Sequence, residues 1–149
     1  MKLSGDYRFN IPREQLWEAL FDPAVVGECV PGLKTFTQQT PDRYDVELSM
    51  RVGIVSGTYK GTVEVVEKDA PASCRVSIRG TGVRTNLQGE GSVALTAEDG
   101  GTALAFEGDV QVTGTLARVG QRFMSSVAQT QFDKFFQCLS AKMERAQGC

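Results

Sequence analysis

Alternation of apolar and polar residues dominates much of the chain and predicts strands with one buried face. Near the N-terminus it predicts a half-buried strand whose inward positions are Leu3, Gly5, Tyr7, Phe9 and Ile11. A helix is expected next, because Pro12 suits a first helical position and Glu14 suits the first turn. Asp22-Pro23 ends this helix, and a second short helix through Val26 is expected before residues 29–32.

Six further runs with a period of two predict six more strands. The runs contain Phe36, Tyr44–Val52, Tyr59–Val65, Cys74–Ile78, Val93–Ala97 and Leu104–Val112. Turn signals stand between them at Ala70-Pro71, Thr85-Asn86 and Asp99-Gly100, and the last is typical of a type I′ hairpin. Consecutive strands with short turns predict an antiparallel meander with one solvated face.

The period becomes helical after Gly114, and no Pro or Gly interrupts residues 121–147. A sheet with one apolar face needs a cover, and this segment carries the only apolar stripe large enough. We therefore expect one α+β domain over residues 1–149. In it, a seven-stranded curved antiparallel sheet wraps around a long C-terminal helix, with two short helices after the first strand.

Glycine is frequent, with 16 in 149 residues, and several glycines fall at inward strand positions. If the hairpins turn at the three signals, the facing pairs are Gly61–Gly80, Gly80–Gly91, Gly82–Gly89 and Gly91–Gly108. These registers predict a row of glycines across four strands on the core face. Two interpretations remain open: the row lets the sheet bend and the helix approach closely, or it helps to hollow out a cavity between them.

Histidine is absent, which excludes His-based acid–base catalysis, Ser-His-Asp and Cys-His pairs, and His-ligated metals. No catalytic residue, metal site or cofactor is predicted. Asp22 and Glu28 are interpreted as solvated or capping carboxylates, and Trp17 as a core residue. Three residues could be polar groups at a pocket or ordinary strand residues: Tyr44, Arg51 and Tyr59.

The cysteines are Cys29, Cys74, Cys138 and Cys149, and none belongs to a CxxC pair. We expect small buried side chains with reduced thiols. The N-terminus lacks the apolar core of a signal peptide, and no run approaches 18 apolar residues. A net charge of −2 gives no basic field for nucleic acid. A soluble cytoplasmic protein is expected.

Several segments together carry a family resemblance. They are Leu3-Ser4-Gly5, Trp17–Pro23, Cys29-Val30-Pro31-Gly32, the glycine-spaced hairpin Val52–Gly61 and the helix start Gly114–Gly120. These segments resemble the CoxG family, which is named for carbon monoxide dehydrogenase, and the match covers almost the whole chain. The Cys-Val-Pro-Gly segment and the hairpin are fairly specific in combination.

The resemblance implies the START-like (SRPBCC) helix-grip fold, with a deep apolar cavity under the C-terminal helix. It also implies association with molybdenum-containing carbon monoxide dehydrogenases or related hydroxylases. Roles proposed for the family are recruitment of such enzymes to the membrane and delivery of a quinone. Many members continue into a membrane-binding tail. Because this sequence stops at Cys149, we expect at most peripheral contact with the inner face of the membrane.

Our leading hypothesis is therefore a protein that binds a hydrophobic small molecule, a quinone or a lipid, and serves such a hydroxylase without being an enzyme itself. One alternative is an assembly or membrane-recruitment factor that acts through its surface. Another is a cyclase or hydrolase of the same fold, which would need Tyr, Asp, Glu or Arg side chains in the cavity. The expected ligand-binding residues are Val30, Pro31, Leu33, Met50, Val52, Tyr59, Phe106, Leu116, Val119, Phe123, Met124 and Val127.

Overall fold

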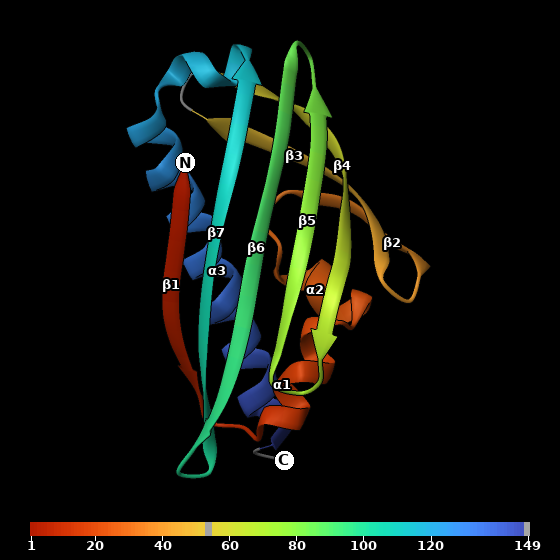
Figure 1. Cartoon of the computed structure of the whole chain (residues 1–149), viewed down its shortest axis with the longest axis vertical. Coiled ribbons are helices and arrows are strands. Elements are labelled where there is room, and N and C mark those ends of the chain that lie inside the picture. The colour runs from red at the N-terminus through yellow and green to blue at the C-terminus, as the bar shows by residue number, and fades with distance from the viewer. Residues whose placement is uncertain (53–54, 148–149) are drawn as a thin grey trace.

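The computed structural model describes residues 1–52 and 55–147, and the elements within them follow the expected order (Figure 1). They are β1 (Lys2–Phe9), α1 (Arg13–Leu20), α2 (Pro23–Cys29), β2 (Leu33–Thr40), β3 (Arg43–Val52), β4 (Val55–Asp69), β5 (Ser73–Gly82), β6 (Thr85–Glu98), β7 (Gly101–Gly114), the 3-10 helix η1 (Thr115–Val119) and α3 (Gln121–Gln147). The strands form one sheet in the order β1-β7-β6-β5-β4-β3-β2, and all neighbours are antiparallel. The expected α+β architecture is confirmed.

The short helices begin where the sequence indicates. The carbonyl group of Pro12 accepts the first backbone hydrogen bonds of α1, and Glu14 lies in the first turn. Asp22 caps α2, because its carboxylate accepts a hydrogen bond of 3.0 Å from the backbone N–H of Ala24. Both helices lie at one end of the sheet, which is the lower end in Figure 1.

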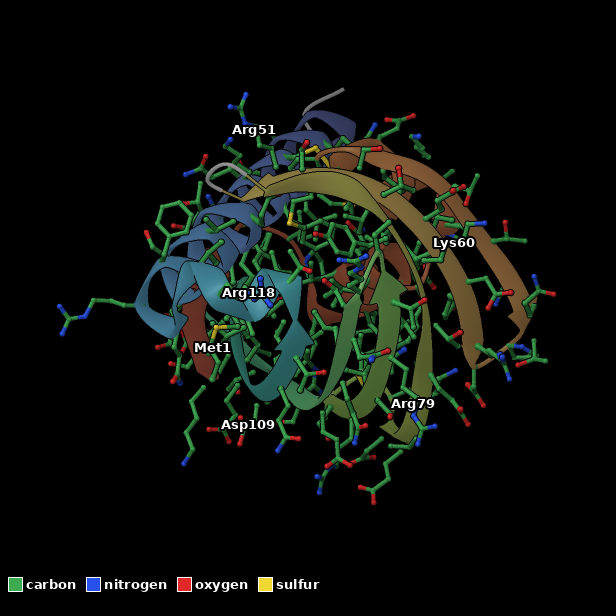
Figure 2. All side chains as sticks on the ribbon, turned by 90° about the horizontal axis from the view of Figure 1, so that it is seen from above. Met1, Arg51, Lys60, Arg79, Asp109 and Arg118 are labelled. Carbon is green, nitrogen blue, oxygen red and sulfur yellow. A yellow bond between two sulfur atoms is a disulfide. The ribbon has the colours of Figure 1, made fainter. Side chains whose placement is uncertain are left out.

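The long helix α3 crosses one face of the sheet diagonally (Figure 1). It starts beside η1 at the upper end, where the β5–β6 turn also lies, and it ends beside α1 at the lower end. Its close neighbours include β1, α1, α2 and η1. The seen-from-above view in Figure 2 shows how the sheet curves around the helices. This arrangement is a helix grip.

The hydrophobic core lies toward the lower end. One cluster joins β1, β6 and β7 to α1 and α3, with Phe9, Leu16, Leu104 and Leu139 at most 1% exposed. A second, smaller cluster contains Tyr44, Val65 and Cys74 on β3, β4 and β5. Burial raises the pKa of the Cys74 thiol, as expected for a small buried side chain. Neither cluster reaches the upper end of the sheet.

The predicted glycine row is half right. Gly61 faces Gly80 and Gly91 faces Gly108, as predicted. The predicted pairs Gly80–Gly91 and Gly82–Gly89 are wrong, because Gly80 faces Leu87 and Gly82 faces Thr85. The β5–β6 turn lies at residues 83–84 instead of Thr85-Asn86. The register therefore differs by an even number of residues, so the glycines keep their predicted face.

The position of this turn follows from Thr85, which is 3% exposed and belongs to β6. Its hydroxyl donates to the Val83 carbonyl oxygen at 3.2 Å and accepts from the Leu116 N–H at 3.3 Å. A buried hydroxyl with two partners is well satisfied inside the fold. The polar Thr85-Asn86 pair is thus part of a strand and does not form the turn.

The expectation of reduced thiols is wrong for two of the cysteines. Cys29 at the end of α2 and Cys138 in α3 form a disulfide across a sequence separation of 109 residues. An ion pair between Glu28 and Lys142 joins the same two helices. Cys74 is free and buried, and Cys149 lies outside the described residues. The cysteine spacing could not show that the fold brings α2 and α3 together.

Candidate functional site

The candidate site is the inner face of the sheet at its upper end, opposite the first turns of α3. We call this region the chamber. It is lined by apolar side chains that are all half-buried: Val46, Leu48, Met50, Ile78, Leu87, Val110 and Val112 from the sheet, and Met124 and Val127 from α3. Their strand positions share the inward parity of Tyr44 and Val65, which belong to the core.

Burial along strand β6 shows how the two ends of the inner face differ. Leu95 lies on the inner face near the lower end and is 2% exposed. Leu87 lies on the same face near the upper end, yet it is only half-buried. Protein side chains fill the space beside Leu95 and leave accessible apolar surface beside Leu87. An apolar face of this kind, concave and incompletely covered, is suited to an apolar guest.

A group of aromatic rings separates the chamber from the core. The ring centroid of Phe106 lies 4.6 Å from that of Phe132 and 5.8 Å from that of Phe136, and the Tyr7 ring lies 4.4 Å from Phe136. Phe106 lies over Gly5, where an added Cβ would stand 2.6 Å from the ring. Gly5 is therefore glycine because a ring occupies the space of its side chain.

Tyr7 is the polar member of this aromatic group. Its hydroxyl donates a hydrogen bond of 2.5 Å to Asp133 on α3. Burial first, and then this hydrogen bond and the negative charge of Asp133, raise the pKa of Tyr7 to about 12. The hydroxyl is therefore a neutral structural link between β1 and α3 and is unsuited to act as a base.

Tyr59 is the only titratable inner-face residue of the sheet within the described part of the chamber. Its ring covers Gly82, because a Cβ at Gly82 would lie 2.6 Å from two ring carbons. Nearby, Gly57 also faces inward, but a Cβ there would meet nothing within 4 Å. The chamber thus has one phenol, an open space at Gly57 and otherwise apolar walls.

Several predicted site residues lie around the chamber. Met50, Tyr59, Met124 and Val127 are half-buried at its walls, and Phe106 lies at its base. The segment Val30–Leu33 is tied to β3, because the Ser49 N–H donates to the Gly32 carbonyl oxygen at 2.8 Å. Val30, Pro31 and Leu33 are half-buried there.

The remaining predicted residues differ in their accessibility. Leu116 is 6% exposed and is part of the wall, whereas Phe123 is 46% exposed at the start of α3. Val119 is half-buried in η1. The side chain of Val52, together with Gly53 and Ile54 of the hairpin that carries the family resemblance, lies outside the described residues.

The sequence analysis missed part of the chamber wall. Val46, Leu48, Ile78, Leu87, Val110, Val112 and Gly57 also line it. The signal that could have found them is strand parity, because each lies on the same face as Met50 or Tyr59.

A separate hollow of about 840 Å³ lies on the outer face of the sheet and not under α3. Its floor runs along the Gly61–Gly80 pair, and polar side chains flank this floor on both sides. Acidic residues Asp45 and Glu47 stand on β3, basic residues Lys60 and Arg79 on β4 and β5, and amides on β6 and β7. One interpretation of the glycines is that they open space toward the helix, but this pair underlies a hollow on the opposite face.

The described residues offer little other chemistry. Within them, no group of three or more His, Cys, Asp or Glu side chains could hold a metal ion. No helix in residues 1–52 and 55–147 is both long and apolar enough to cross a membrane. The arrangement is thus fitted to bind a molecule by apolar contact.

Comparison with known structures supports the fold. A conserved protein from Geobacillus kaustophilus superposes with a TM-score of 0.92 and 25% identity, covering 98% of this chain and 97% of that one. A START superfamily protein from Mycobacterium smegmatis has a TM-score of 0.73 and 13% identity, with 97% and 98% covered. The Zhui aromatase/cyclase from Streptomyces sp. R1128 has a TM-score of 0.68 and 12% identity, with 97% and 94% covered. The fold is START-like.

Comparison of sequences is more specific. A search of proteins with curated functions finds no significant match. The profile of the carbon monoxide dehydrogenase CoxG family matches residues 5–144. This match spans nearly the whole chain, including the glycine-spaced hairpin and the Cys-Val-Pro-Gly segment. The chain therefore belongs to the CoxG family.

Proposed function

We propose that the protein binds a hydrophobic small molecule, a quinone or a lipid, in the chamber, and that it serves a carbon monoxide dehydrogenase-type molybdenum hydroxylase as an accessory protein. The observation that carries this proposal is the half-buried apolar face between Met50, Leu87 and Val112. Covering apolar surface contributes about 25 cal/mol per Å² before ordering costs. An isoprenoid or acyl chain would gain this contribution without displacing any core side chain.

The test is a calorimetric titration of protein first stripped of bound lipid. A naphthoquinone with a single isoprenyl group should bind saturably and raise the melting temperature, because a ligand that binds only the folded state stabilises it. The variant Gly57→Leu should lower affinity at least about tenfold, since its side chain would enter the open space at Gly57.

Ser56→Leu is the matched control, because it places the same side chain on the opposite face of β4. It should leave the affinity unchanged. Absence of binding to the stripped wild-type protein would rule out the proposal.

A second candidate function is docking of the hydroxylase on the outer face of the sheet, and the polar hollow along Gly61 and Gly80 favours it. Such docking would assemble or recruit the enzyme without a guest in the chamber. Co-purification separates the two functions. Docking through the outer surface should survive Gly57→Leu, whereas a role as carrier requires an open chamber.

Catalysis in the chamber is a third candidate function, because one protein of similar fold is an aromatase/cyclase. An acid–base reaction needs at least two groups within hydrogen-bonding reach of the substrate. The described chamber wall offers the single phenol of Tyr59 from the sheet. An accessory role is therefore the better-supported proposal.

A further inference from the structure

Charge is distributed very unevenly over this protein. Three sequence segments contribute to the upper end of the molecule, residues 48–60, 79–89 and 110–132. None of them contains Asp or Glu, although the chain has 18 acidic residues and a net charge of −2. The same segments carry the basic residues Arg51, Lys60, Arg79, Arg84, Arg118 and Arg122. The end of the molecule at which the chamber lies is thus locally cationic on an otherwise acidic protein.

Structural details strengthen this local positive potential. Figure 2 shows this end from above, with Arg118 and Arg51 on different sides of it, and Lys60 and Arg79 toward the outer face. On β7, Asp109 is the acidic residue that borders the end, and the N-terminal ammonium group lies 3.3 Å from its carboxylate (Figure 2). The first turn of α3 also contains no acidic residue, so the positive end of the helix dipole is not neutralised there.

Arg84 and Arg118 lie on two elements that are joined at this end. The Thr115 N–H of η1 donates to the carbonyl oxygen of Arg84 at 2.8 Å. In a 3-10 helix of three residues per turn, Arg118 follows Thr115 on the same side. Both arginines are exposed, and neither has an ion-pair partner in the described part of the chain. Their charges are therefore available to a ligand.

The β5–β6 turn is also unusual in its residues. Arg84 has a φ of +51°, a conformation that most side chains avoid and that Gly or Asn would adopt more readily. Its neighbour Val83 is 83% exposed, and Phe123 at the start of α3 is 46% exposed. Apolar and cationic side chains are thus presented together at the end of the chamber that the core does not close.

We propose that the ligand of the chamber is an amphiphile with a carboxylate or phosphate head. Its tail lies against the apolar walls, and its head is held at the upper end by Arg84 and Arg118. This inference rests on the proposed function and specifies its ligand class. A neutral quinone would use the walls and leave the arginines unpaired, whereas a guanidinium group binds a carboxylate or phosphate with two parallel hydrogen bonds.

The test compares monomeric decanoate, decyl phosphate and decan-1-ol by calorimetry on the full chain at pH 7.5. The three probes share one tail, so a difference in affinity reports the head. We expect both anions to bind about tenfold more tightly than the alcohol, because hydrogen bonds to charged groups are stronger than neutral ones. The preference should shrink as salt is raised from about 0.05 to about 0.5 M, since ions screen exposed charges.

Variants assign the head to its site. The double variant Arg84→Gln/Arg118→Gln should abolish the preference for anions and leave the affinity for decan-1-ol unchanged. Arg75→Gln is the matched control, because Arg75 is exposed on the outer face of β5 and lies 3.8 Å from Glu90. It should retain the full preference.

The outcomes separate this inference from the proposed function. Equal affinities of the three probes for the wild-type protein would overturn the anion preference and leave the apolar chamber supported. A preference that survives the double variant would overturn the assignment to Arg84 and Arg118. Failure of all three probes to bind would overturn both proposals.

Discussion

Two glycines on the inner face of β4 have very different surroundings. Gly57 and Gly61 lie four residues apart on this strand, so their missing side chains would point to the same side. A Cβ on Gly57 would meet nothing within 4 Å, whereas a Cβ on Gly61 would lie 2.6 Å from the carbonyl oxygen of Arg79. The first glycine leaves space in the chamber, and the second allows two backbones to approach each other. The two interpretations of the glycines therefore apply at different positions.

This contrast predicts opposite effects of the same substitution. Gly61→Ala should lower the free energy of unfolding by about 1–3 kcal/mol, because the Arg79 carbonyl cannot move without disturbing the β4–β5 ladder. Gly57→Ala should be neutral or stabilise the fold by up to about 1 kcal/mol, because alanine restricts the unfolded chain. Urea denaturation of both variants measures the effects. Similar destabilisation by both variants would contradict the difference in packing.

The hydrogen bond between Tyr7 and Asp133 predicts a specific pH dependence. The pKa of Tyr7 is raised to about 12 in the folded state, mainly by burial. The folded state thus holds this proton more tightly than the unfolded state, where the tyrosine pKa is about 10. The stabilisation is therefore fully present below pH 10 and is lost as the pH rises from about 10 to about 12.

Nuclear magnetic resonance with tyrosine labelled at Cζ can follow this titration at each ring. The Tyr7 signal should shift only near pH 12. Asp133→Asn should lower the pKa in part, since it removes the negative charge but leaves the burial that is the largest cause. An unchanged titration in Asp133→Asn would show that this carboxylate has no effect on Tyr7.

At the scale of elements, the sequence predicted much and missed what depends on tertiary contacts. Period two and period 3.6 predicted the strands, the short helices and α3 in the correct order. The β5–β6 turn was misplaced because the polar residues Thr85 and Asn86 resemble a turn, whereas the Thr85 hydroxyl is satisfied by η1. The predicted ligand-binding residues omit several residues of the chamber wall, because they were selected by type more than by parity. The Cys29–Cys138 bond joins residues that only the folded chain brings together.

The disulfide predicts a large effect of reduction. It closes a long loop between α2 and α3, and a loop of this length restricts the unfolded chain by roughly 3–5 kcal/mol. Treatment with a dithiol reductant should lower the urea midpoint accordingly. In Cys29→Ser/Cys138→Ser the midpoint should be low from the start and should not respond to reductant. A response that persists in this double variant would assign the effect to a different cysteine pair.

The whole molecule has two functional halves along the length of its sheet. At the lower end, α1, α2 and the second half of α3 cover the sheet and form the buried core. At the upper end, the inner face is lined by half-buried apolar residues and bordered by an acid-free cationic surface. The stability of the fold and the proposed binding of a ligand thus depend on different ends of the same strands. Separation of this kind lets a chamber remain open without unfolding the domain.

Two leucines on β6 provide a direct test of this division. Leu95→Ala should lower the free energy of unfolding by about 2–5 kcal/mol, because it leaves a void in a core where Leu95 is 2% exposed. Leu87→Ala should cost less than about 1 kcal/mol in the ligand-free protein, since its side chain already borders accessible space. When a bound amphiphile fills the chamber, Leu87 gains contacts, and the cost of Leu87→Ala should rise while that of Leu95→Ala stays constant. Urea denaturation with and without saturating decanoate measures all four values. Equal costs for the two leucines in the ligand-free protein would mean that the upper end is packed like the core, and the chamber would lose its physical basis.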